Sequence, residues 1–176
     1  LLIKDVLAMD IDEHKMTVPW YRDWIPALVA ITVLGTDQFT KHMIKNILLL
    51  GESWPTKGVL RITHGLNTGT AFGFFPDQTV LLSVISLFGI GFVIYFYKTQ
   101  KTPTVWVKLA VGLIIGGAAG NLIDRLRDGA VVDFISVGWW PSFNVADSSI
   151  VIGMTILVAV YYLGNRSQAK RMADQT

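Results

Sequence analysis

Two aspartates stand in apolar surroundings between two long apolar segments. Asp133 lies in the run Val131–Phe134 (VVDF), and Asp147 follows the run 143–146 (FNVA). A carboxylate at the edge of a membrane is costly, so it usually serves a function there. Two carboxylates that converge can share one proton and activate a water molecule, as they do in aspartic proteases. Asp133 and Asp147 are therefore candidates for acid–base chemistry.

The surroundings of these two aspartates differ. The neighbours of Asp133 are apolar and β-prone, so partial desolvation would raise its pKa. Asp147 opens an apolar segment, where it could instead be a helix N-cap or a first-turn acid stabilised by the helix dipole. Asn144, three residues before it, offers an amide that could orient a carboxylate or a substrate carbonyl.

A third carboxylate, Asp124, belongs to a polar cluster at the end of an apolar segment. Asn121, Asp124 and Arg125 share one helical face at spacings of three and four. A nearby cation such as Arg125 would keep Asp124 ionised and unsuited to sharing a proton. We therefore expect Asp124 to give structural support rather than to take part in the chemistry.

The composition predicts an integral membrane protein. The 176 residues are 52% hydrophobic and 16% charged, against roughly 25% charged for a soluble domain, and the mean hydropathy is +0.48. The net charge of +2 comes from scattered residues, so no basic patch suggests nucleic acid as a partner. The chain has no cysteine, and its three histidines follow no metal-ligand spacing. We expect no metal and no other cofactor.

The apolar segments predict a mainly α membrane protein with four transmembrane helices. The expected spans are 24–40, Val80–Tyr97, Val105–Ile123 and Ala146–Leu163. The first is the weakest, because Asp37 and Lys41 follow its apolar run; four residues apart, they could form an interfacial ion pair. Residues 51–76 alternate in polarity and are rich in Gly, Thr and Pro, which predicts a small extracytoplasmic β element between the first two helices.

Glycines recur every four residues in the third predicted helix, at Gly112, Gly116 and Gly120. Such a stripe of small side chains lets a second helix approach closely. We interpret it as a packing surface.

The positions of lysine and arginine predict the orientation in the membrane. Nine of the 15 lie on one side of the predicted spans and six on the other, which favours cytoplasmic termini. The chain then divides into a polar cytoplasmic N-terminal extension (1–22), a four-helix membrane domain (23–165) and a cytoplasmic C-terminal tail (166–176). Residues 51–76 and 124–146 would face outward, with both candidate aspartates.

Five short motifs occur in order along the chain. They are 37–41 (DQFTK), 67–73 (NTGTAFG), 120–125 (GNLIDR), 131–134 (VVDF) and 143–148 (FNVADS). Together they closely resemble the lipoprotein signal peptidases, also called signal peptidase II. The resemblance extends from about Asp37 to Ser148.

This resemblance implies a bacterial membrane protease in the cytoplasmic (inner) membrane, with its active site near the outer face. Its partners would be prolipoproteins, cut just before the cysteine that carries a diacylglyceryl group, membrane lipids, and globomycin-type inhibitors. The family is metal-independent and uses two aspartates, which correspond to Asp133 and Asp147. The residues that shape the site would be Asp37, Asn67, Asn121, Arg125 and Asn144, with Asp124 as structural support.

Two other classes of function deserve comparison. Intramembrane carboxylates also relay protons in small proton-coupled transporters, but here the acidic residues sit at helix ends and no inverted repeat is visible. A non-catalytic membrane scaffold would explain the glycine stripe. It would not explain why so many polar residues gather on one side of the membrane.

Overall fold

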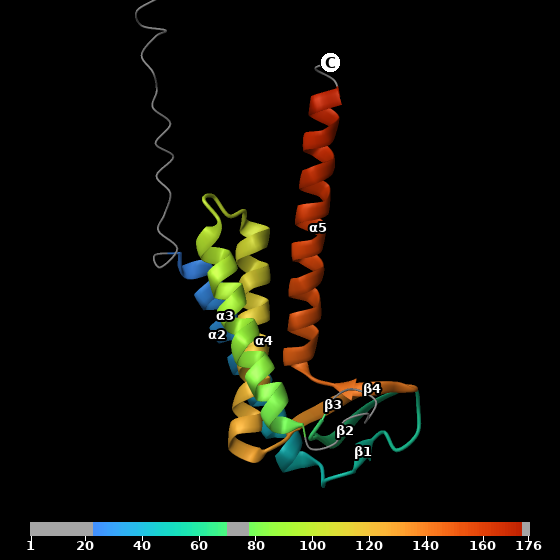
Figure 1. Cartoon of the computed structure of the whole chain (residues 1–176). Helices are drawn as coiled ribbons and strands as arrows, with labels where there is room; N and C mark the ends of the chain where they lie inside the picture. The colour runs from blue at the N-terminus through green and yellow to red at the C-terminus, as the bar shows by residue number, and fades with distance from the viewer. Residues whose placement is uncertain (1–22, 70–77, 174–176) are drawn as a thin grey trace, which may run out of the picture.

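The computed structural model describes residues 23–69 and 78–173, with side chains up to Gly164 in the last helix (Figure 1). The predicted N-terminal extension (1–22) and most of the motif at 67–73 lie outside the described residues. In chain order the elements are α2 (Trp24–Ile47), β1 (Ser53–Trp54), β2 (Leu60–Asn67), α3 (Thr79–Thr99), α4 (Val105–Asp128), β3 (Val131–Val137), β4 (Trp140–Phe143) and α5 (Val145–Ala173).

The prediction of a mainly helical membrane protein is confirmed. Among the described residues, three helices are long and apolar enough to cross a membrane, at Thr79–Thr99, Val105–Asp128 and Val145–Gly164. These helices correspond to the second, third and fourth predicted spans. The helix α2 is not among them, because polar residues including Asp37 and Lys41 interrupt its apolar run. Its role as a fourth span stays a prediction.

Several helices are longer than the apolar pattern predicted. The helix α2 continues to Ile47 instead of stopping at 40, and α4 continues to Asp128. Both extensions contain charged residues, and each begins near a buried one, Lys41 in α2 and Asp124 in α4. The helix α4 ends at Gly129, whose φ of 72° is the left-handed conformation common after a helix.

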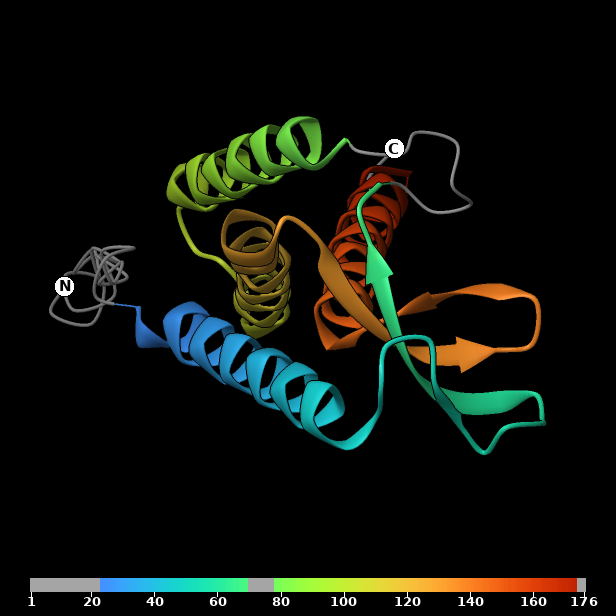
Figure 2. The ribbon, with the colours of Figure 1, turned by 90° about the horizontal axis from the view of Figure 1, so that it is seen from below.

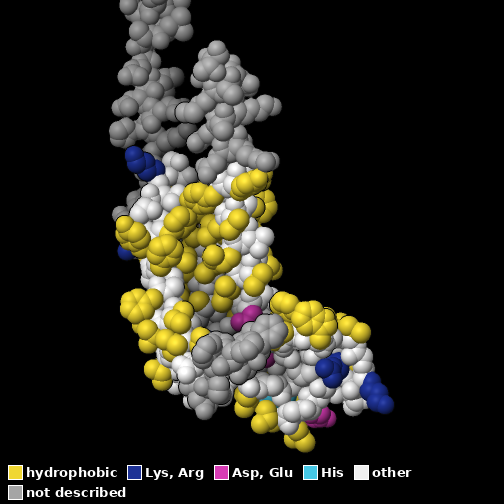
Figure 3. Space-filling model, turned by 45° about the vertical axis from the view of Figure 1, so that its right-hand side comes forward, with side chains coloured by type: hydrophobic (Ala, Val, Ile, Leu, Met, Phe, Trp, Pro, Cys, Tyr) yellow, Lys and Arg dark blue, Asp and Glu magenta, His cyan; other side chains and the backbone are white. Residues whose placement is uncertain are grey.

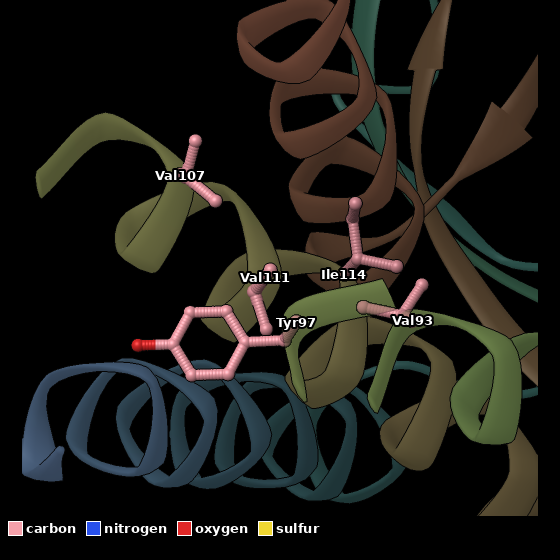
Figure 4. Packing of buried hydrophobic residues seen from close by; sticks show 5 residues of the cluster. All are labelled: Val93, Tyr97, Val107, Val111 and Ile114. Atoms are coloured by element: carbon pink, nitrogen blue, oxygen red, sulfur yellow. The ribbon is translucent and has the colours of Figure 1, made fainter. Parts of the chain in front are cut away.

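The helix α4 is the centre of the bundle. It packs against α2, α3 and α5, as the view from below shows (Figure 2). Val107, Val111 and Ile114 of α4 meet Val93 and Tyr97 of α3 in the main buried apolar cluster (Figure 4).

The glycine stripe of α4 packs against α2. A Cβ atom added to Gly116 would lie 2.6 Å from the carbonyl oxygen of Ala30, and one added to Gly112 would lie 2.6 Å from Cβ of Val29. Real Cβ atoms do not approach this closely, so the two backbones touch only because these side chains are absent. The interpretation as a packing surface is confirmed.

A four-stranded antiparallel sheet, in the order β1-β2-β3-β4, projects from one end of the bundle below α5 (Figure 1). The predicted element at 51–76 supplies β1 and β2. No β element was predicted between the last two helices, and there the structure has β3 and β4. Residue 65 pairs with Asp133 and Asn67 pairs with Val131, so the end of β2 lies beside the first candidate aspartate.

Replacing Gly116 with alanine tests the packing surface. The new methyl group would overlap α2, and such overpacking costs about 1–3 kcal/mol. Gly89→Ala in α3 is the matched control, because nothing lies within 4 Å of its added Cβ and both changes gain the same helix propensity. Thermal unfolding in detergent should show a lower midpoint for Gly116→Ala only. Equal midpoints would contradict close packing of α2 on α4.

Candidate active site

The site lies where the sheet meets the ends of α2, α4 and α5. Asp133 occupies the middle of β3 and is 5% exposed. Asn67 Nδ2 donates to its Oδ2 at 2.9 Å, and Asn144 Nδ2 donates to its Oδ1 at 2.8 Å. Each oxygen of this carboxylate therefore has an amide partner from a different part of the chain.

Asp147 lies in the first turn of α5, and Asn144 is the residue just before that helix. The backbone N–H of Asp147 donates to Oδ1 of Asn144 at 2.9 Å, while the N–H of Asn144 donates to Oδ2 of Asp147 at 3.2 Å. This reciprocal pair is a capping box. Asp147 is thus the first-turn acid that the sequence allowed. The capping box holds its carboxylate beside Asn144.

Asn121 of α4 joins the two halves of the site. Its Nδ2 donates to Oδ1 of Asp147 at 2.7 Å. Its Oδ1 accepts from Asn144 Nδ2 at 3.1 Å and from Lys41 Nζ at 3.0 Å. Since Asn144 contacts both Asp133 and Asp147, the two carboxylates lie within one continuous hydrogen-bonded network.

Burial raises the pKa of Asp133 to about 6, and the negative charge of Asp147 acts in the same direction. The hydrogen bonds from Asn67 and Asn144 oppose this rise, because they favour the ionised carboxylate. Asp147 is only half-buried. The two aspartates therefore differ in their environment, which is how a carboxylate pair comes to hold one proton.

A second cluster centres on Lys41, which is 2% exposed. Its Nζ lies 2.8 Å from Oδ2 of Asp37 and 2.9 Å from Oδ2 of Asp124, and both carboxylates are fully buried. Buried charges require such pairing. The expected pair of Asp37 and Lys41 is present, but it lies inside the protein and includes Asp124.

The remaining oxygens of this cluster fix the starts of two elements. Oδ1 of Asp37 accepts from the backbone N–H of Ala146 at 3.0 Å, in the first turn of α5. Oδ2 of Asp124 accepts from the N–H of Val132 at 3.4 Å, at the start of β3. The Lys41 cluster therefore positions the two elements that carry Asp133 and Asp147.

Arg125 is half-buried near the end of α4. Its positive charge interacts with the carboxylates of Asp147, Asp133 and Asp124. Arg125 therefore offsets part of the negative charge of the site.

All eight residues named from the sequence thus gather in one region. Two contributors were missed as site residues, namely Lys41 and Gln38. Gln38 Nε2 donates to Oδ1 of Asp124 at 2.8 Å. The signal that could have found them was a run of polar residues inside an apolar helix.

A cavity of about 410 Å³ adjoins Asp147. It lies between β4 and α5, and its lining consists of Trp140, Phe143, Asp147, Ser148, Val151 and Ile152. In Figure 3 many hydrophobic side chains gather over the helices above the sheet. In the part of the chain that the structure describes, no three His, Asp or Glu side chains are arranged to hold a metal ion.

Comparison with known proteins gives a consistent result. Residues 29–163 match the family described as Signal peptidase (SPase) II. The lipoprotein signal peptidase of Halothermothrix orenii is 44% identical over 133 residues, covering 74% of this chain and 90% of the relative. That of Syntrophotalea carbinolica is 38% identical over 151 residues, covering 81% and 94%.

A solved structure of a bacterial membrane enzyme has the same fold. It superposes with a TM-score of 0.74 at 32% identity, covering 81% of this chain and 90% of the other. The profile match spans most of the described chain and includes the whole polar network. The chain therefore belongs to the signal peptidase II family, the membrane aspartic endopeptidases that remove signal peptides from prolipoproteins.

Proposed function

We propose that Asp133 and Asp147 are the catalytic pair, and that the scissile bond precedes a diacylglyceryl-modified cysteine. The observation that carries this proposal is the bridging by Asn144, which contacts both carboxylates beside an apolar cavity. A carboxylate pair held by neutral amides is free to share a proton. The carboxylates of Asp37 and Asp124 instead both pair with the ammonium group of Lys41.

In the proposed mechanism Asp133 holds the shared proton, because its burial favours the neutral form. Asp147, which lines the cavity, takes a proton from water as the water oxygen adds to the scissile carbonyl carbon. The proton on Asp133 stabilises the oxyanion that forms. When the C–N bond breaks, the proton on Asp147 passes to the leaving amine, which restores the starting state.

The neighbouring residues would keep this pair in place. Asn67 and Asn144 orient Asp133, and Asn121 orients Asp147. Asp37 and Asp124 act through Lys41 as structural support. Arg125 contributes a positive charge that limits repulsion between the two carboxylates.

We also propose that α2 is a fourth span. Asp37 and Lys41 are buried, so they do not face lipid, Lys45 near the end of the helix pairs with Asp128, and Trp24 and Ile31 are exposed. With the lysine and arginine bias, this favours cytoplasmic termini and a site near the outer face of the bacterial cytoplasmic membrane. The extension (1–22) and tail (166–176) would then be cytoplasmic.

The signal peptide would approach through an apolar groove between α3 and α5. This groove has a volume of about 360 Å³ and contains Phe92, Phe96, Leu157 and Val158 among its lining residues. An apolar helix suits such a surface, while the lipid chains of the substrate stay in the bilayer. Globomycin-type inhibitors would compete for the same site. The proton-coupled transporter is not favoured, since the chain belongs to a peptidase family.

Substitution of the proposed pair tests the function. Asp133→Asn and Asp147→Asn should each lower single-turnover cleavage of a diacylglyceryl-modified prolipoprotein by about 10²–10⁴-fold. The double variant should be little worse than either single one, because the pair acts as a unit. A gel-shift assay with and without globomycin measures the cleavage.

Asp128→Asn is the matched control, since Asp128 is a more exposed carboxylate that pairs with Lys45 at the end of α4. It should cleave like the wild type. Cleavage near the wild-type rate by Asp133→Asn or Asp147→Asn would remove that residue from the catalytic pair.

The pH dependence tests which aspartate holds the proton. If Asp133 must be protonated, cleavage should be lost as the pH rises through about 6, where this group ionises. Asn67→Leu removes a hydrogen bond that lowers this pKa. The alkaline limb of the pH profile should therefore move to higher pH. Asn46→Leu is the control, at an exposed position with His42 as partner, and it should leave the alkaline limb at the same pH. A shift of the limb to lower pH in Asn67→Leu would refute the assignment of the proton to Asp133.

The Lys41 cluster should matter more for stability than for chemistry. Lys41→Met leaves two buried carboxylates without their cation, at a cost of about 3–5 kcal/mol. Lys45→Met, one turn later and partly exposed beside Asp128, should cost about 1 kcal/mol or less. The midpoints of thermal unfolding compare these two variants.

The variant Asp124→Asn should also unfold at a lower temperature, while its single-turnover cleavage rate should change little. A fully folded but inactive Asp124→Asn would instead place Asp124 in the chemistry.

A further inference from the structure

We propose that the tip of the β3–β4 hairpin is a membrane anchor that lies in the headgroup region of a phospholipid leaflet. This inference rests on the proposed membrane placement of the helices. It concerns what fixes the depth of the candidate active site relative to the bilayer. The tip patch consists of Val59, Leu60, Trp139 and Trp140. The partner it fits is a phospholipid surface.

The tip patch consists of exposed apolar side chains around the hairpin turn. Trp139 is 84% exposed, Val59 71%, Leu60 64% and Trp140 53%. The N–H of Gly138 donates to the carbonyl oxygen of Val59 at 2.6 Å, which ties the hairpin turn to the start of β2. Exposed apolar patches that contain large aromatic rings mark contact surfaces.

The cavity beside this patch relates the patch to the apolar span of α5. Trp140 lines the same cavity as Val151 and Ile152 of α5, and both of these lie inside the apolar span Val145–Gly164. At 1.5 Å per residue, Val151 is about 9 Å along the helix from Val145. Trp140 therefore lies beside the start of the span, where the sheet meets α5.

The chemistry of the patch suits a membrane interface. Tryptophan concentrates there because its ring is apolar and its indole N–H can meet water or headgroups. Trp139 and Trp140 pack edge to face with ring centroids 5.6 Å apart, which stiffens the pair. Lys57 and Arg61 belong to the adjoining loop and strand, and lysine and arginine side chains lie near hydrophobic ones at the outer part of the sheet in Figure 3.

The strand β3 connects this patch to the site. It contains Asp133 and ends at Val137, next to the hairpin turn. Four residues of strand span about 13 Å. An anchored tip therefore fixes how far Asp133 stands from the bilayer, because the strand between them is held on both sides by hydrogen-bonded neighbours.

The absence of native cysteine makes a direct depth measurement simple. Val59→Cys, labelled with a nitroxide, reports on the tip while both tryptophans stay in place. Arg127→Cys, at an exposed position near the end of α4, is the control. The full chain is placed in vesicles of phosphatidylcholine and phosphatidylglycerol without substrate, and collisions with oxygen and with a water-soluble nickel chelate are compared.

We expect the ratio of oxygen to nickel collisions to be roughly tenfold higher at position 59 than at position 127, since the bilayer excludes the chelate. Adding Trp139→Ser should lower the ratio at position 59 severalfold, and Trp139→Tyr should preserve it. Equal ratios at positions 59 and 127 would overturn the anchor, as would a ratio at position 59 that Trp139→Ser leaves unchanged.

A cleavage assay separates an anchor from a substrate contact. For an anchor, Trp139→Ser should raise KM severalfold in vesicles and leave it unchanged in detergent micelles, where no bilayer fixes the depth. An equal rise in both media would overturn the anchor and make Trp139 a substrate contact. The collision measurement needs no substrate, so failure of the proposed proteolytic mechanism would leave it interpretable.

Discussion

The arrangement of the site depends on one buried cation. Lys41 lies between Asp37 and Asp124, and each of these carboxylates also accepts a backbone N–H from the start of another element. One ammonium group thus sets α2, α4, α5 and β3 in a single arrangement. A buried ion pair is weak evidence for net stability. Its effect here is geometrical, because the three charged groups and the two backbone N–H groups are satisfied together in this arrangement.

That arrangement brings together two carboxylates with different environments. Asp133 is a strand residue held by two side-chain amides, while Asp147 belongs to a helix start and is fixed by a capping box with Asn144. Each carboxylate is held in place by partners on a strand or helix, and Asn144 contacts both of them. Such preorganisation is what lets fixed polar groups stabilise a transition state without rearranging.

The sequence was a good guide to elements with a strong local pattern. Apolar run lengths predicted α3, α4 and α5, and the motifs named eight residues that the structure brings into one region. The strands β3 and β4 were missed because Gly138 and Pro141 break the segment into short pieces that resemble turns. The burial of Lys41 could not be predicted either. Its partner Asp124 is distant in the chain, and an ion pair four residues apart is usually a surface feature.

The position of the sheet suits the proposed function. A prolipoprotein would offer its scissile bond at the boundary between an apolar signal peptide and a segment in water, so the proposed catalytic carboxylates would need a fixed height above the apolar groove. The helices alone set this height poorly, because spans tilt to match the thickness of the bilayer. A sheet that joins α4 to α5 and places Trp140 beside the start of α5 adds a second reference point. Contact of the hairpin with the membrane surface and packing of the helices would then both fix the depth of the active site.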